Sequence, residues 1–164
     1  MAAWKSSPSA MNTLPIPSPF APFHQERRDA SDPYASAGES SQLLRSGAQF
    51  RRERIEANDM ITTDEAAHLA GTSRVTINAW IKSGRCIGVS NLRRGFKLPI
   101  WQFEPAIWPI LHPLAKSLGT ADGWQLLSFL ESPSMALDGK TPRVALEQGI
   151  ATDRVLALAN AEAH

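Results

Sequence analysis

The stretch TTDEAAHLAGTSRVTINAWIKSG, residues 62–84, decides the fold, because it predicts two short helices joined by a tight turn. Thr62 is placed to cap the first helix, and Glu65 follows three residues later, which is the spacing of a capping box. Gly71 supplies a stop where a left-handed backbone costs little, and Ser73 offers its hydroxyl as the cap of the second helix. The stretch therefore predicts the geometry of a helix-turn-helix.

The second predicted helix divides into an apolar and a polar face. Side chains at positions i, i+3 and i+4 are expected to face inward, and they are Ile77, Trp80 and Ile81. The side chains left for the outer face are Arg74, Val75, Asn78, Ala79 and Lys82. A basic, polar outer face is typical of a helix that enters the major groove of DNA. The alternative is an ordinary helical hairpin inside a larger core.

A short β-hairpin is expected directly after these helices. Residues 87–90 form its first predicted strand, residues 91–95 its turn, and residues 96–98 its second strand, which Pro99 stops. The turn carries Arg93 and Arg94, so the hairpin has the character of a wing whose cations reach backbone phosphate or the minor groove. The alternative is a solvated hairpin tip.

Residues 62–99 resemble the excisionase and MerR-type winged helix-turn-helix. The matching elements are Thr63-Asp64-Glu65-Ala66-Ala67, Gly71-Thr72-Ser73-Arg74, Thr76-Ile77, Ile81-Lys82-Ser83-Gly84 and Phe96-Lys97-Leu98-Pro99. In that family the start of the second helix and the wing meet DNA. By matching position the resemblance implies contacts from Ser73, Arg74, Thr76, Asn78, Arg93, Arg94 and Lys97, and Lys82 is expected to add a phosphate contact.

The C-terminal part predicts a small helical bundle. Residues 100–118 are the most apolar stretch and are expected to form a core seam, the alternative being an exposed binding groove. Pro109 is expected to open a helix that Pro113 bends. Three helices follow: one over residues 122–131, one after Thr141-Pro142 and one capped by Thr152. Helices this short cannot each hide a full face, so we expect an apolar strip available to a partner.

Residues 98–163 are similar to the toxin-binding domain of Xre/MbcA/ParS-type antitoxins and its upstream connector. The matching residues are Leu98-Pro99-x-Trp101-Gln102-Phe103, Trp124-x-Leu126-x-x-Phe129-Leu130, Pro133, Leu137-Asp138-Gly139-x-Thr141-Pro142, Leu146, Gly149 and Val155-x-x-Leu158-Ala159. The resemblance implies binding of a cognate RES-type toxin, which degrades NAD, and repression of the chain's own operon. It implies partner contacts from Trp124, Leu137, Asp138, Gly139, Thr141, Pro142 and Arg143.

Composition bounds the remaining possibilities. The 164 residues carry a net charge of +1, but residues 59–100 hold six basic and three acidic side chains, whereas residues 101–164 hold four and seven. This division is expected if one half meets phosphate and the other a protein. The single Cys86 and four scattered histidines predict neither a disulfide framework nor a metal site. No long apolar run or secretion signal is present, so the sequence predicts a cytoplasmic protein without a membrane segment.

The sequence thus predicts a mainly α-helical protein in four parts. Residues 1–39, rich in proline and serine, are expected to be a disordered arm, the alternative being a proline-rich ligand. Residues 40–58 predict a helical linker whose marginal apolar stripe would gain from packing on a second copy of itself or on the following domain. Residues 59–103 predict the winged helix-turn-helix and residues 104–164 the toxin-binding bundle.

The leading functional hypothesis is a type II antitoxin that binds operator DNA and a toxin, as a homo-oligomer suggested by the resemblance. It assigns no catalytic residue, cofactor or metal, because no recognisable catalytic motif or phosphate-binding loop occurs in the sequence. The alternatives are a stand-alone DNA-binding transcriptional regulator of excisionase or MerR type and a small enzyme.

Overall fold

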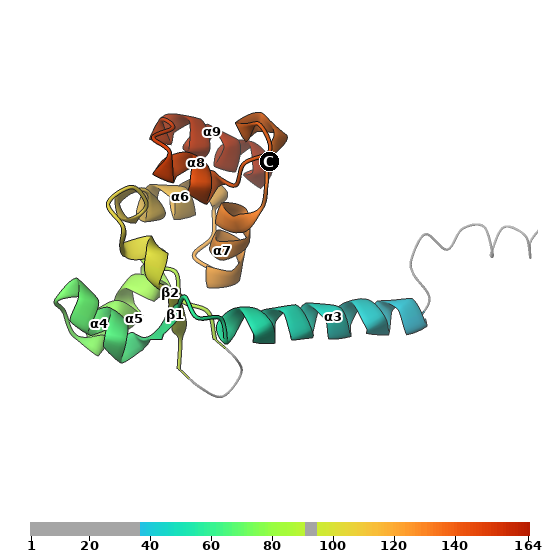
Figure 1. Ribbon diagram of the computed structural model, residues 1–164, viewed down its shortest axis with the longest axis horizontal. Helices are drawn as coiled ribbons and strands as arrows, with labels where there is room; N and C mark the ends of the chain where they lie inside the picture. Colours follow the sequence, from blue (N-terminus) through green and yellow to red (C-terminus); the bar gives the residue numbers. More distant parts are fainter. Residues whose placement is uncertain (1–36, 91–94) are drawn as a thin grey trace, which may run out of the picture. The chain divides into compact units, whose positions relative to one another are not determined.

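The computed structural model describes residues 37–90 and 95–164 and is mainly helical, with one two-stranded antiparallel sheet (Figure 1). Its elements are α3 (Ala37–Ile55), β1 (Met60–Thr62), α4 (Thr63–Ala70), α5 (Arg74–Ser83), β2 (Lys97–Pro99), the 3-10 helices η2 (Ile100–Phe103) and η3 (Trp108–Ile110), α6 (Leu111–Leu118), α7 (Gly123–Glu131), η4 (Met135–Leu137), α8 (Pro142–Glu147) and α9 (Thr152–Ala163). Among the described helices, none has the length and apolar character needed to cross a membrane.

The chain divides into two compact units, residues 1–48 and 49–164. The described residues of the first unit form the N-terminal part of α3, which begins at Ala37 and so takes in the last residues of the predicted arm. The rest of that arm lies outside the described residues. All other elements belong to the second unit, in which α6 to α9 group together and α4 and α5 group beside the strands (Figure 1).

The predicted capping of α4 and α5 is confirmed. The Thr62 hydroxyl accepts a hydrogen bond from the Glu65 amide at 3.1 Å, and the Glu65 carboxylate accepts one from the Thr62 amide at 2.9 Å. Gly71 ends α4 with a φ of 68°, in the left-handed region. The Ser73 hydroxyl then accepts from the Thr76 amide at 3.2 Å and starts α5. These local hydrogen bonds fix where each helix begins, and Gly71 ends α4, so a short turn separates the two helices.

The predicted hairpin is confirmed only in part, because Val89 and Lys97 exchange two backbone hydrogen bonds, of 2.9 and 2.8 Å, across an antiparallel bridge. β2 pairs with β1, so that Ile61 lies opposite Leu98, and the expected first strand contributes only a single bridge from Val89 to Lys97. β1 directly precedes α4, and its three residues are too few to give an alternating pattern in the sequence. Residues 91–94 of the predicted hairpin turn, which spans residues 91–95, lie outside the described residues.

Two clusters of buried side chains form the core of the second unit. The smaller lies under α4 and α5 and comprises Ala66, Ala67, Ile77, Ile81, Cys86 and Leu98. The larger comprises Met60, Ile87, Val89, Trp101, Ile107, Ile110, Leu111, Leu114, Ala115, Leu126, Leu127, Phe129, Leu130, Leu146, Val155 and Ala159. The larger cluster contains residues from both predicted domains, 59–103 and 104–164. The two predicted domains therefore share one hydrophobic core, to which the apolar stretch at residues 100–118 contributes.

Three glycines mark places where the backbone packs closely. An added Cβ at Gly123, the first residue of α7, would lie 2.0 Å from the Gly88 carbonyl oxygen. An added Cβ at Gly88 would lie 2.5 Å from the Ile81 side chain of α5, and one at Gly84 would lie 2.6 Å from the Ala115 side chain of α6. The segment after α5 is therefore packed directly against the C-terminal helices.

Two predictions about the C-terminal helices need correction, a bend at Pro113 and a cap at Thr152. Pro113 is the third residue of α6 and lies in its first turn, where a missing N–H costs nothing, so it does not bend the helix. Thr152 is the first residue of α9 and not its cap, because Ala151 holds that position without a side-chain bond. By contrast, the Thr141 hydroxyl accepts from the Val144 amide at 3.1 Å, with Pro142 as the first residue of α8, as predicted.

Candidate functional sites

The outer face of α5 is free of core packing. Val75 is 77% exposed, and the Arg74 side chain is 61% exposed. Lys82 is exposed near the C-terminal end of the helix, and Asn78 is half-buried on it. The core contacts of α5 come instead from Ile77 and Ile81, which are buried as predicted. The helix thus presents two apolar side chains, Val75 and Ala79, and several polar ones to solvent.

The polar groups at the start of α5 are only partly free to bind a ligand. The Ser73 hydroxyl is the helix cap and also lies 3.0 Å from the Thr76 hydroxyl. The Arg74 guanidinium lies 3.8 Å from the Asp64 carboxylate, and both side chains are exposed. A pair this exposed contributes little to stability, so Arg74 can turn to another anion at small cost.

The predicted basic wing is described except for residues 91–94. Lys97 lies half-buried on β2, where it pairs with Thr62 of β1 and bridges to Val89. Arg93 and Arg94 lie outside the described residues, and their role stays a prediction. The structure therefore places Lys97 in the β1–β2 sheet.

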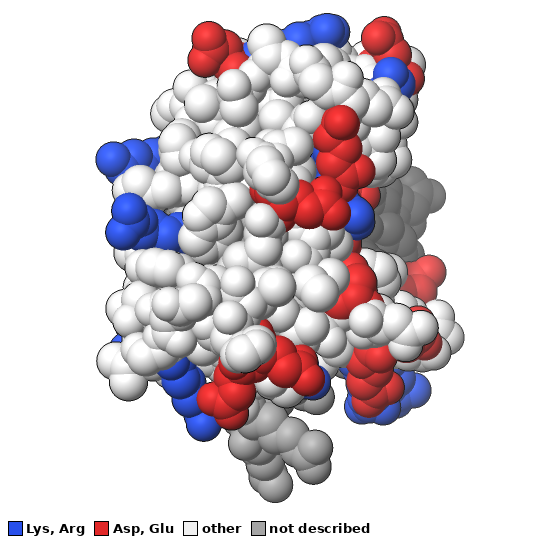
Figure 2. Space-filling model, turned by 60° about the vertical axis from the view of Figure 1, so that its left-hand side comes forward, with Lys and Arg blue, Asp and Glu red and all other residues white. Residues whose placement is uncertain are grey.

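Charged groups of both signs occupy the face drawn in Figure 2. Uncharged side chains cover most of this face, basic side chains lie toward its margins, and acidic side chains lie between them (Figure 2). This face carries no field of a single sign. Attraction for phosphate is therefore local to individual basic side chains and is screened over about 10 Å at moderate salt.

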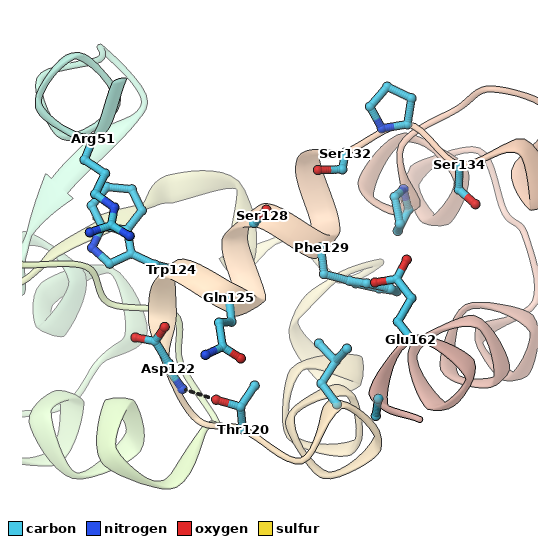
Figure 3. A pocket seen from close by; sticks show the side chains of 14 residues that line it. Arg51, Thr120, Asp122, Trp124, Gln125, Ser128, Phe129, Ser132, Ser134 and Glu162 are labelled. Atoms are coloured by element: carbon cyan, nitrogen blue, oxygen red, sulfur yellow. Dashed lines mark hydrogen bonds between the residues drawn. The ribbon is translucent and has the colours of Figure 1, made fainter. Parts of the chain in front are cut away.

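A groove of about 630 Å³ runs along α7. We call it the α7 groove, and its lining residues are Arg51, Leu118, Thr120, Asp122, Trp124, Gln125, Ser128, Phe129, Ser132, Pro133, Ser134, Pro142, Glu162 and Ala163. Figure 3 shows Trp124 facing Arg51 at one end and Phe129 beside Glu162 at the other. Hydroxyl, amide and carboxylate groups alternate here with aromatic surface, a mixture that suits a protein partner better than a purely apolar ligand.

Trp124 and Arg51 form a cation–π contact at the mouth of the α7 groove. The central carbon of the Arg51 guanidinium lies 5.5 Å from the centroid of the Trp124 ring. Trp124 is half-buried, so the arginine covers part of its face. No local pattern in the sequence predicts this pair, because the two residues lie far apart in the chain.

The structure gives most of the predicted partner residues a structural role. Trp124 and Pro142 both line the α7 groove. Leu137 is 1% exposed and belongs to the core, whereas Asp138 and Gly139 form an exposed turn with φ values of 58° and 81°. Thr141 caps α8. The predicted set is therefore not one surface.

Arg143, the last of this set, packs on a different part of the second unit. Its guanidinium lies 4.5 Å from the centroid of the Trp101 ring and 2.8 Å from the Glu147 carboxylate. The contact with Trp101 joins α8 to η2, whereas the bond to Glu147 lies within α8. The spaced Leu-Asp-Gly-x-Thr-Pro residues thus have a structural explanation as a turn and a helix start.

A partly buried ion network joins the end of α3 to the end of α7. The Arg54 guanidinium donates two hydrogen bonds of 2.8 Å to the Asp59 carboxylate and bonds of 3.0 and 2.6 Å to the Glu131 carboxylate. Burial opposes the ionisation of Asp59, but its hydrogen bonds and attraction to Arg54 outweigh this effect and lower its pKa. The bond to Glu131 likewise raises the pKa of Arg54.

A smaller hollow of about 230 Å³ lies beside α5, lined by Trp80, Arg85, Trp108, Pro109 and His112. The Trp80 and Trp108 rings meet edge to face with centroids 5.6 Å apart. Within the described part of the chain, the His112 Nδ1 atom is buried without a hydrogen-bond partner. The hollow is therefore aromatic, with one basic side chain at its rim.

The candidate metal and thiol chemistry is limited. In residues 37–90 and 95–164, no cluster of three or more His, Cys, Asp or Glu side chains could hold a metal ion. Cys86 is buried, and burial raises the pKa of its thiol to about 12. A thiol with so high a pKa is protonated at neutral pH and is a poor nucleophile.

Comparison with protein-family models, with curated proteins and with solved structures found no match to this chain.

Proposed function

We propose that this chain is an antitoxin that binds operator DNA through residues 59–103 and a RES-type toxin through residues 104–164. The observation that supports it most is the α4–α5 pair, whose caps define the turn while the outer face of α5 is left to solvent. A helix held in this way by a packed neighbour can enter the major groove without losing core contacts.

In this proposal the module is a winged helix-turn-helix. Ser73, Arg74, Thr76 and Asn78 face the DNA from α5, and Lys82 contacts phosphate. The segment that contains Arg93 and Arg94 leads to Lys97 and acts as the wing. Phosphate contacts fix the position of the protein, and the α5 side chains read base edges.

Salt-dependent binding to operator DNA tests this half. Five phosphate contacts, from Arg74, Lys82, Arg93, Arg94 and Lys97, predict a slope of roughly −4 to −5 for the logarithm of affinity against the logarithm of salt. Arg74→Ala is expected to reduce the slope by about one. Lys116→Ala, an exposed change on α6, serves as the matched control. An affinity that hardly changes with salt would contradict DNA binding through these residues.

The toxin-binding half rests on the resemblance of residues 98–163 and is supported by the α7 groove. The groove is open and mixed in chemistry, and Trp124, a residue implied by the resemblance, lies at its mouth. Aromatic anchors of this kind often carry much of the binding energy at protein interfaces. Occupation of the groove by a toxin would displace Arg51 from the Trp124 ring or enclose the pair.

Co-expression tests this half. The product of an adjacent reading frame is expected to arrest growth when expressed alone and to be tolerated with this chain. Trp124→Ala is expected to weaken protection against the toxin. The control is Met135→Ser, because Met135 is 89% exposed and does not line the α7 groove, and this variant is expected to protect as the wild type does. Growth arrest that persists with the wild-type chain would argue against the antitoxin.

A stand-alone regulator is the second candidate. It is favoured by the structural roles of Leu137, Thr141 and Arg143, which account for the motif without a partner. Gel filtration with and without the neighbouring gene product separates the two candidates. An antitoxin is expected to elute as a stoichiometric complex, whereas a stand-alone regulator is expected to elute unchanged.

A further inference from the structure

The α3 helix carries an apolar face that solvent reaches. Leu43, Leu44 and Phe50 are 68%, 75% and 62% exposed, respectively. Single exposed apolar side chains are ordinary, but three within two turns of one helix form a patch. Patches of this kind mark interaction surfaces in soluble proteins.

The spacing of this face suits another helix. Leu43 and Phe50 are seven residues apart and therefore lie on one stripe of α3. Gly47 lies between them on the same side, and a Cβ added there would meet nothing within 4 Å. A glycine at the middle of the stripe permits the close approach of a second backbone.

The C-terminal turn of α3 already has partners within its own unit. Arg51 lies over Trp124, Arg54 binds Asp59 and Glu131, and Ile55 packs against the larger core. This end is therefore anchored. The Leu43 and Phe50 side chains, by contrast, are exposed.

We propose that a second copy of α3 packs antiparallel across this stripe, about a two-fold axis near Gly47. In this arrangement Leu43 of each copy meets Phe50 of the other, so the surface is complementary to itself, as a two-fold interface requires. The proposal concerns self-association and does not depend on DNA or toxin binding.

Charge decides the direction of the two helices. A parallel pair would bring Arg51 and Arg52 beside their own copies, and like charges in contact are unfavourable. An antiparallel pair with Leu43 opposite Phe50 sets these arginines beside the uncharged residues 41–42. The opposed helix dipoles favour the same direction.

Sedimentation equilibrium of the full chain tests the interface. The wild type is expected to dimerise, and the double variant Leu43→Glu, Phe50→Glu to raise the dissociation constant by on the order of ten-thousandfold, because the two copies together lose four buried apolar side chains and each contributes on the order of tenfold. Glutamate is a good helix former, so circular dichroism should show unchanged helicity. Met135→Glu is the matched control, since Met135 is 89% exposed in η4.

Cysteine cross-linking tests the direction in a Cys86→Ser background. A mixture of Leu43→Cys and Phe50→Cys chains is expected to form mixed disulfides, whereas neither variant should cross-link with itself. Three results would overturn the proposal: a monomer at all concentrations, a dimer indifferent to the glutamate pair, or self-linking of Leu43→Cys, which indicates parallel helices. A monomer that dimerises only after removal of residues 1–36 would also overturn it, since the arm would then be the occupant.

Discussion

At the scale of single residues, the buried Gln102 side chain makes the hydrogen bonds to the Ile87 backbone that a neighbouring strand would otherwise make. It is fully buried, its carbonyl oxygen accepts from the Ile87 amide at 2.7 Å, and its amide donates to the Ile87 carbonyl at 2.9 Å. The backbone N–H and C=O groups of Ile87 are thereby satisfied by a side chain and not by a neighbouring strand.

Gln102→Leu is expected to lower the free energy of unfolding by about 2–4 kcal/mol, because two buried backbone groups lose their partner. Urea denaturation measures this change. Gln125→Ala, on the exposed side of α7, is the control and should stay within about 0.5 kcal/mol of the wild type. A Gln102→Leu chain as stable as wild type would show that the pair of bonds contributes little.

The Arg54 network predicts a dependence of stability on pH. Because the pKa of Asp59 is lowered in the folded state, its ionised form stabilises the fold at pH values above its ordinary pKa. That contribution is lost as the pH falls through the lowered value. The stability difference between wild type and Arg54→Met should therefore be largest near pH 7 and narrow toward pH 3. Arg154→Met is the control, since Arg154 donates to the Ala136 carbonyl, which does not titrate. A difference that stays constant over this range would count against the network.

At the scale of elements, the helix caps provide a matched pair of threonines. Thr141 caps α8 through its hydroxyl, whereas Thr152 is the first residue of α9 and makes no cap bond. Thr141→Ala is expected to cost about 1 kcal/mol of unfolding free energy, and Thr152→Ala less than about 0.5 kcal/mol. Thermal denaturation of the two variants measures the difference. Equal losses would mean that α9 is capped by Thr152 in solution after all.

How far the sequence predicts these elements depends on the range of the interactions. The caps at Thr62, Ser73 and Thr141 are local, so residue types and spacing were enough to find them. The pairing of β1 with β2 joins segments far apart in the chain, and Arg54 meets Glu131 across 77 positions. Such contacts leave no local periodicity. For the same reason Trp124 is among the residues predicted to bind a partner, whereas nothing in the sequence points to Arg51, which covers it.

At the scale of the whole second unit, α7 and the segment after α5 meet backbone to backbone. Gly123→Ala would place a Cβ 2.0 Å from the Gly88 carbonyl oxygen, so the backbone must move. We expect a loss of about 1–3 kcal/mol of unfolding free energy, the usual cost of overpacking. Ser128→Ala, exposed on the same helix, is the control and should be nearly neutral. Chemical denaturation that finds the two variants alike would contradict the close contact.

The same contact has a consequence for how such a chain can evolve or be re-engineered. Gly88 touches Gly123 on one side and Ile81 of α5 on the other, so the two halves share an interlocking joint as well as a common core. A chimera spliced at residue 103 would inherit only one side of that joint and would expose Met60, Ile87, Val89 and Trp101 to water. Under the proposed function, new DNA specificities are therefore more easily obtained by replacing surface side chains of α5 than by exchanging halves between proteins.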